Sequence, residues 1–114
     1  MKLLHAVVVA VLSLGLSSCV VSEQKFDQYR TVLRNRPDIR AQLMAKCVNK
    51  MLANSAEKRA AMAEMVDLKL ATFPQAFCRR MEANFLSGRL TYADYRDVMA
   101  QRPTPRLIRL MRGK

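Results

Sequence analysis

The sequence predicts an all-α fold, a small bundle of four to five short helices with one disulfide, behind an N-terminal leader. Three observations predict it. Apolar residues recur at intervals of three and four, no alternating β pattern of useful length occurs, and capping residues separate the apolar runs. With 114 residues in all, the chain is long enough for one domain, which we place at residues 23–101.

Residues 1–18 are predicted to be a cleaved signal peptide. Met1-Lys2 gives a short positive start, and the apolar run that follows is shorter than the ~20 residues of a membrane-spanning helix. The run ends in Leu16-Ser17-Ser18-Cys19. This tetrapeptide resembles the lipobox of bacterial lipoproteins, which is an aliphatic residue, two small residues and a cysteine. The alternative is an uncleaved N-terminal anchor helix.

The resemblance implies a lipid on Cys19. In that class the cysteine thiol receives a diacylglyceryl group, a peptidase that recognises Leu16, Ser17 and Ser18 cuts before the cysteine, and the new amine receives an acyl chain such as palmitate. Several acyl chains, at ~0.8 kcal/mol per buried CH₂, attach a protein to a bilayer almost permanently. Residues 19–22 would then be a lipidated tether.

The residues after Cys19 bear on the membrane. In Gram-negative lipoproteins, aspartate directly after the cysteine retains the protein in the inner membrane, whereas this chain has Val20 and Val21. The resemblance therefore implies a lipid-anchored protein of the bacterial cell envelope, in the outer membrane and facing the periplasm.

Lipidation of Cys19 would leave Cys47 and Cys78, an even number in an oxidising compartment, and so predicts one disulfide. Two alternatives remain. One is a pair of free buried thiols. The other is a soft-metal site formed by Met44, Cys47 and Met51, which share a helix face. Methionine at helical spacing is usually core filler, so we expect no metal and no cofactor.

The first two helices are expected at 23–34 and 37–53. Phe26, Tyr29, Val32 and Leu33 give the first helix an apolar side. Between the two, Asn35-Arg36-Pro37-Asp38 offers a side-chain acceptor, a proline for the first turn and an acid near the positive helix end. The apolar stripe of the second helix is Ile39, Leu43, Met44, Cys47, Met51 and Leu52.

The remaining helices are expected at 55–70, 73–86 and 92–101. Their starts are predicted by Asn54-Ser55-Ala56-Glu57, Thr72-Phe73-Pro74-Gln75 and Thr91-Tyr92-Ala93-Asp94, and Ser87-Gly88 predicts a left-handed stop. The residues expected to face inward are Met62, Met65, Val66 and Leu70, then Phe77, Cys78, Met81 and Phe85, then Tyr92, Tyr95, Val98 and Met99. A bridge from Cys47 to Cys78 would join the second and fourth helices.

Residues 102–114 are predicted to form a basic amphipathic tail. Pro103 and Pro105 break the preceding helix, and no acid follows. The basic residues of the tail are Arg102, Arg106, Arg109, Arg112 and Lys114. On a helix they would form a cationic face beside an apolar one, which is typical of an interfacial membrane segment. The alternative is that Leu107 and Leu110 pack on the core while the arginines stay solvated.

No catalytic residue is predicted. The sole histidine, His5, lies in the leader, so the mature chain has no Ser-His or Cys-His pair, and glycine-rich phosphate loops are missing. Glu57, Glu64 and Asp67 are interpreted as ordinary helix-surface charge. We therefore expect a protein that is not an enzyme.

The charge balance favours polyanionic partners. The chain has 20 basic and 9 acidic residues, and because Lys2 is the only charge in the leader, the mature chain keeps 19 against 9. An exported chain meets lipopolysaccharide, peptidoglycan and lipid phosphates rather than nucleic acid. The sequence thus predicts an envelope lipoprotein that contacts the bilayer through its acyl chains and anionic surfaces through Arg102, Arg106, Arg109 and Arg112. The alternative is an accessory or structural subunit of an envelope protein assembly.

Overall fold

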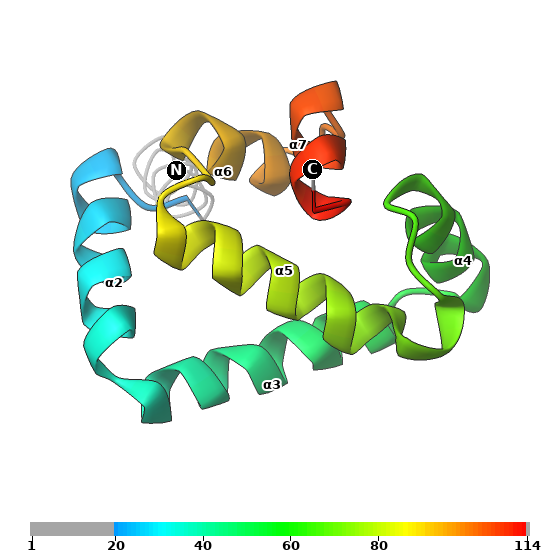
Figure 1. The fold of residues 1–114 in the computed structure, drawn as a ribbon, viewed down its shortest axis with the longest axis horizontal. Coiled ribbons are helices and arrows are strands. Elements are labelled where there is room, and N and C mark those ends of the chain that lie inside the picture. Colours follow the sequence, from blue (N-terminus) through cyan, green and yellow to red (C-terminus); the bar gives the residue numbers. More distant parts are fainter. Residues whose placement is uncertain (1–19, 114) are drawn as a thin grey trace, which may run out of the picture.

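A computed structural model describes residues 20–113, which form six α-helices, one 3₁₀ turn and no strand (Figure 1). The helices are α2 (Glu23–Asn35), α3 (Pro37–Ala53), α4 (Ala56–Met65), α5 (Phe73–Ser87), α6 (Tyr92–Met99) and α7 (Pro105–Met111), with η1 (Leu70–Thr72) before α5. The all-α prediction is confirmed, and α7 adds a helix where a tail was expected. The expected signal peptide, with Leu16, Ser17, Ser18 and Cys19, lies outside the described residues, as does Lys114.

Hydroxyl side chains begin four of the helices. Ser22, Ser55 and Thr104 each accept a hydrogen bond from the backbone N–H three residues later, which satisfies one of the unpaired donors of a first turn. At α6, Thr91 accepts from the Asp94 N–H at 3.1 Å and the Asp94 carboxylate accepts from the Thr91 N–H at 2.9 Å. This reciprocal pair is a complete capping box.

Two expected caps are wrong. The Asn35 amide donates to the Thr31 carbonyl at 3.0 Å within α2, and Thr72 occupies the N-cap of α5 without a side-chain cap bond. In both cases a proline stands in the first turn of the next helix, and its fixed φ starts the helix without help from a cap. Near the start of α3, a hydrogen bond from the Arg36 guanidinium lowers the pKa of Asp38 to about 2, in an exposed pair.

The helix expected over 55–70 ends earlier, at Met65. Asp67 takes a left-handed conformation with φ 55°, and the Leu68 N–H donates to the Ala63 carbonyl at 2.9 Å. The last helix of the predicted domain ends in the same manner, with Gln101 at φ 56°. Both are helix stops of the Schellman type, which the sequence conceals because neither position is the usual glycine. Gly88, at φ 82°, is the stop that was expected.

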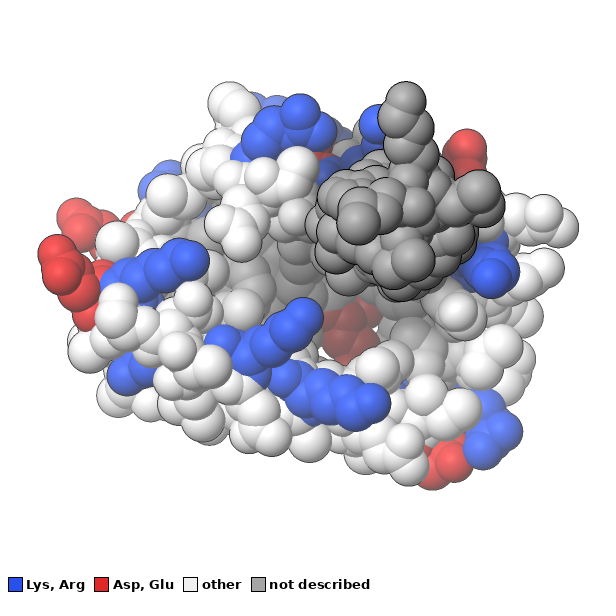
Figure 2. Space-filling view, turned by 180° about the vertical axis from the view of Figure 1, so that it is seen from behind, with Lys and Arg blue, Asp and Glu red and all other residues white. Residues whose placement is uncertain are grey.

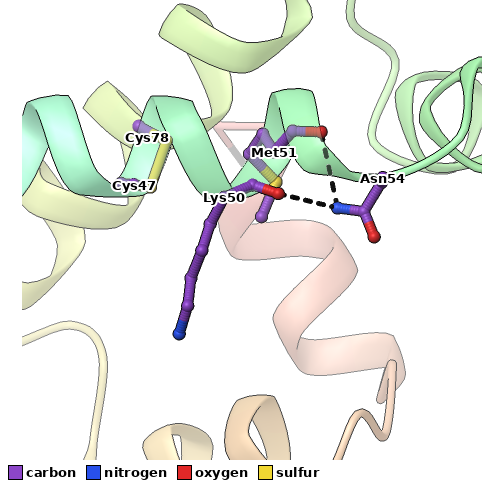
Figure 3. The surroundings of a disulfide bond; sticks show 5 residues. All are labelled: Cys47, Lys50, Met51, Asn54 and Cys78. Atoms are coloured by element: carbon purple, nitrogen blue, oxygen red, sulfur yellow. Dashed lines mark hydrogen bonds between the residues drawn. A yellow bond between two sulfur atoms is a disulfide. The ribbon is translucent and has the colours of Figure 1, made fainter.

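The centre of the fold is the pair α3 and α5, which run in opposite directions side by side (Figure 1). Cys47 and Cys78 join them with a disulfide whose Cα atoms are 5.9 Å apart, as predicted. Beside the bridge, the Asn54 amide donates to the carbonyls of Lys50 and Met51 at the end of α3, and the Lys50 side chain extends away from the sulfur atoms (Figure 3). The bridge thus encloses α4 and η1 in one loop.

The C-terminal helix α7 is part of the core. Met111 packs with Phe73, Val66 and Ala63, while the two buried leucines of α7 pack with Leu90. Helix α5 also holds the last turn of α7, because the Asn84 amide donates to the Leu110 carbonyl at 3.2 Å and Arg80 donates to the Met111 carbonyl. Over the described residues 102–113 a separate tail is therefore not observed. The alternative is confirmed for Leu107 and Leu110, which pack on the core, but not for Arg106, whose guanidinium bonds to buried Asp94.

Several residues expected to face inward are exposed. They are Tyr29, Val32, Leu43, Leu52, Met65, Leu70 and Met99. Helical periodicity places such residues on an apolar face, but a face is buried only where another element covers it. In this fold part of the apolar face of α2 and of α3 is left uncovered.

Candidate functional site

The four arginines predicted to bind anionic surfaces do not form one cluster. Arg102 pairs with Asp97 at 3.2 Å, and Arg112 donates to the Met65 carbonyl at 3.0 Å, at the end of α4. Arg106 and Arg109 lie together on α7 and line the same small pocket. Of the four predicted arginines, Arg102 and Arg112 therefore make separate contacts with other residues, and only Arg106 and Arg109 lie together.

Arg106 holds three segments together. Its Nε atom donates to both carboxylate oxygens of Asp94 at 3.1 Å, and Nη2 donates to the Arg89 carbonyl at 2.8 Å. The Asp94 side chain is almost completely buried and also caps α6. Because Asp94 neutralises its charge, we assign Arg106 mainly a positioning role.

The pocket beside Arg106 has a volume of about 220 Å³ and is lined by Arg89, Arg106, Arg109 and Leu110. Arg89 and Arg109 are exposed. Guanidinium groups are planar, permanently charged and suited to bidentate bonding with phosphate or carboxylate oxygens. Arg89 was missed by the sequence reasoning, because it follows Gly88 in a loop and no spacing links it to α7.

On one face of the molecule, positive charge is dispersed. On the face drawn in Figure 2, Lys and Arg side chains are spread among a few acidic ones rather than gathered in one patch. This face therefore has no single cationic patch, whereas the Arg89–Arg109 pocket places two guanidinium groups together.

A second feature is an apolar groove of about 610 Å³ bounded by α2, α3 and α5. Its walls include Tyr29 and Val32 from α2, Ile39 and Leu43 from α3, and Met81 and Phe85 from α5. The disulfide also lines it. Exposed Tyr29, Val32 and Leu43 thus open onto a concave surface rather than being scattered singly.

Charge in this groove is balanced. Among the described residues that line it, Arg40 and Glu82 are the charged ones, and Arg40 Nε lies 3.9 Å from Glu82 Oε1. Arg40 also donates to the Leu33 carbonyl. With these groups engaged, the groove offers mostly hydrocarbon to an occupant.

The N-terminal end of the described chain is fixed at the groove. The Val21 N–H donates to Tyr95 Oη at 3.1 Å, and Tyr92 Oη donates to the Val21 carbonyl at 2.8 Å. Val21 and Tyr95 both line the groove, and both tyrosines pack around Phe26. The expected tether is therefore fixed to α6 at Val21 rather than free up to residue 22.

The soft-metal site predicted as an alternative at Met44, Cys47 and Met51 is contradicted, because Cys47 is bonded to Cys78 and has no thiolate to offer a metal. Within residues 20–113, no group of three or more His, Cys, Asp or Glu side chains is arranged to hold a metal ion. In the same part of the chain, no helix combines the length and apolar character needed to cross a bilayer. Comparison with protein-family models, curated proteins and solved structures gave no match.

Proposed function

We propose that this chain is a lipid-anchored, non-enzymatic lipoprotein of the bacterial cell envelope, whose Arg89–Arg109 pocket contacts anionic groups of the adjacent surface. The anchor rests on one observation, the sequence Leu16-Ser17-Ser18-Cys19 at the end of an apolar run. The anionic contact is supported by the convergence of Arg89 and Arg109 on one pocket.

The short connection between anchor and domain supports the proposal. Val21 is held by two tyrosines, so only Val20 separates it from Cys19. At 3.8 Å per Cα step, the lipidated residue can lie no more than about 8 Å from Val21. A domain held this close to the lipidated residue stays at the membrane surface, where a net positive charge is attracted to anionic groups.

The chemistry of the envelope gives the partner class. Phosphates of lipopolysaccharide and carboxylates of peptidoglycan both suit guanidinium donors. Each Lys or Arg held near an anionic membrane surface contributes about 1 kcal/mol. Placement in the outer membrane, facing the periplasm, follows from valine rather than aspartate at positions 20 and 21.

Replacing Cys19 with serine is expected to abolish lipid attachment. Wild-type cells fed labelled palmitate should incorporate the label into this chain, and intact mass should show loss of residues 1–18 with gain of acyl groups. Cys19→Ser should carry no label, because an alcohol does not replace the thiolate as the lipid acceptor. Ser18→Ala, which keeps a small residue, is the matched control and should behave as wild type. Equal labelling of Cys19→Ser would contradict the anchor.

Removing both exposed arginines of the pocket is expected to weaken binding to lipopolysaccharide. For the lipidated chain in neutral nanodiscs, Arg89→Gln with Arg109→Gln should raise Kd by about tenfold to thirtyfold, since two contacts of about 1 kcal/mol are lost. The effect should shrink as salt rises. Affinity is measured by surface plasmon resonance, with peptidoglycan fragments as a second ligand.

The control removes the same charge elsewhere. Lys46→Gln with Lys58→Gln alters two exposed lysines on α3 and α4, and should change Kd by less than about threefold because neither lysine lines the pocket. Equal losses in both double variants would mean that net charge alone is responsible, and the pocket assignment would fail.

A further inference from the structure

From the groove we infer that it holds one acyl chain of the lipid on Cys19 of the same molecule. The inference rests on the proposed lipidation and adds an intramolecular lipid site to it. Three features carry the inference: where the groove begins, what lines it, and how much of it is open.

The position of the anchor point carries the first step. Val21 lines the groove and is fixed there by Tyr92 and Tyr95, and Cys19 is two residues before it. With a reach of about 8 Å from Val21, any lipid on Cys19 starts beside the groove. A chain attached at this point needs no search through solution, because its effective concentration at the groove is set by a very short linker.

The lining selects for hydrocarbon. Arg40 and Glu82 face each other, and the remaining walls are built from aromatic, aliphatic and sulfur side chains. An occupant with unpaired N–H or C=O groups would lose its hydrogen bonds to water without replacement, whereas an acyl chain has none to lose. The volume of about 610 Å³ lies within the ~300–1,000 Å³ of small-molecule sites.

The driving force comes from the protein. An acyl chain already lies in hydrocarbon while it is in the bilayer, so moving it into an apolar groove changes its own environment little. The groove, however, exposes Tyr29, Val32 and Leu43, and an acyl chain covers them. Transfer from bilayer to groove therefore removes apolar protein surface from water.

A second copy of the chain fits this groove less well. In a two-fold dimer the same patch faces itself, and two concave grooves placed face to face leave a gap. A narrow, unbranched chain fills a concave apolar surface without this difficulty.

Photocrosslinking of the intact lipoprotein in living cells tests the inference. Leu43 lines the groove and is 44% exposed, while Leu52 lies on the same helix, is 51% exposed and does not line it. Each is replaced in turn by p-benzoylphenylalanine. On irradiation the ketone takes a hydrogen from a nearby methylene and the two carbons join, so the product mass is the sum of both parts.

The expected product joins the peptide of residue 43 to the Cys19 lipopeptide of the same chain. If most molecules hold the acyl chain in the groove, position 43 should give at least about tenfold more of this product than position 52. Val32, which lines the groove from α2, should give the same product if replaced in the same manner. Should Leu43→p-benzoylphenylalanine disturb the groove, the Val32 variant decides the question.

Each other outcome overturns the inference. A product with free phospholipid means that the groove takes bilayer lipid, and a product of doubled chain mass means that it takes a second copy. Equal yields from positions 43 and 52, or no product from either 43 or 32, mean that the groove does not hold the acyl chain. An intact mass without lipid on Cys19 would instead refute the proposed anchor, so the two failures are distinguishable.

Discussion

Ending the chain at Gln101 is expected to unfold the domain. The deletion removes Leu107, Leu110 and Met111, which are all buried against α4, α5 and the loop before α6. Full burial of one such side chain contributes about 1.5–3 kcal/mol, so the three together contribute about 5–9 kcal/mol. That is comparable to the ~5–15 kcal/mol total stability of a typical domain.

Polar groups add to this loss. Without α7, the carboxylate of buried Asp94 loses its partner Arg106, and the Asn84 amide, also buried, loses the Leu110 carbonyl. A buried group left without its partner costs more than the bond itself contributed. The truncated chain should therefore show no cooperative thermal transition by circular dichroism and should be digested rapidly by protease.

The control keeps α7 and removes only charge. Arg109→Gln alters an exposed side chain on the same helix and should shift Tm by no more than a few degrees, since surface substitutions usually stay within about 0.5 kcal/mol. A truncated chain that still melts cooperatively near the wild-type Tm would show that α7 does not support the core. For the same reason, anion binding by this region is better tested with arginine substitutions than by deletion.

Loss of the disulfide should be the second largest effect. Replacing Cys47 and Cys78 with alanine opens a loop whose ends are 31 residues apart in sequence. The chain-entropy model assigns such a loop about 3.7 kcal/mol. In a domain of 60–100 residues, each kcal/mol shifts Tm by about 4–8 °C, so a fall of roughly 15–30 °C is expected.

The measurement is calorimetry of the lipidated chain in nanodiscs, with and without reductant. Reduction of the wild type should lower Tm about as much as the double substitution, while reductant should leave the substituted chain unchanged. The substituted chain is itself the control for reductant, because it keeps Cys19 and has no bridge left to break. Oxidised and reduced wild type melting within about 2 °C of each other would contradict a stabilising role of this bridge.

Features that depend on adjacent residues were predictable. Ser55 and Thr91 start helices because their hydroxyls reach backbone N–H groups three residues away, and that geometry is local. Gly88 ends α5 because its φ of 82° costs glycine little. The Cys47–Cys78 bridge was also predictable, because only two cysteines remain after Cys19 is assigned to lipid.

Some helix ends and caps were predicted wrongly from the local sequence. Asp67 and Gln101 end helices in the left-handed region, although most side chains avoid it. Directly after Asp67, Leu68 packs against the buried cluster of Ala63, Val66, Phe73 and Met111, which includes a residue from the distant α7. Asn35 and Thr72 have capping side chains, yet the neighbouring proline made their bonds unnecessary.

By itself the sequence determined the helical periodicity, most helix starts, the disulfide and the lipobox resemblance, because each depends on residue types at short or countable spacing. Only the tertiary structure decided that α7 belongs to the core, that Arg89 joins Arg109, and that Tyr29, Val32 and Leu43 border an open groove beside Val21. The reason is physical. Periodicity shows which side of a helix is apolar, but burial depends on which other helix covers that side, and such contacts join distant residues: Met111 of α7 packs on Ala63 of α4.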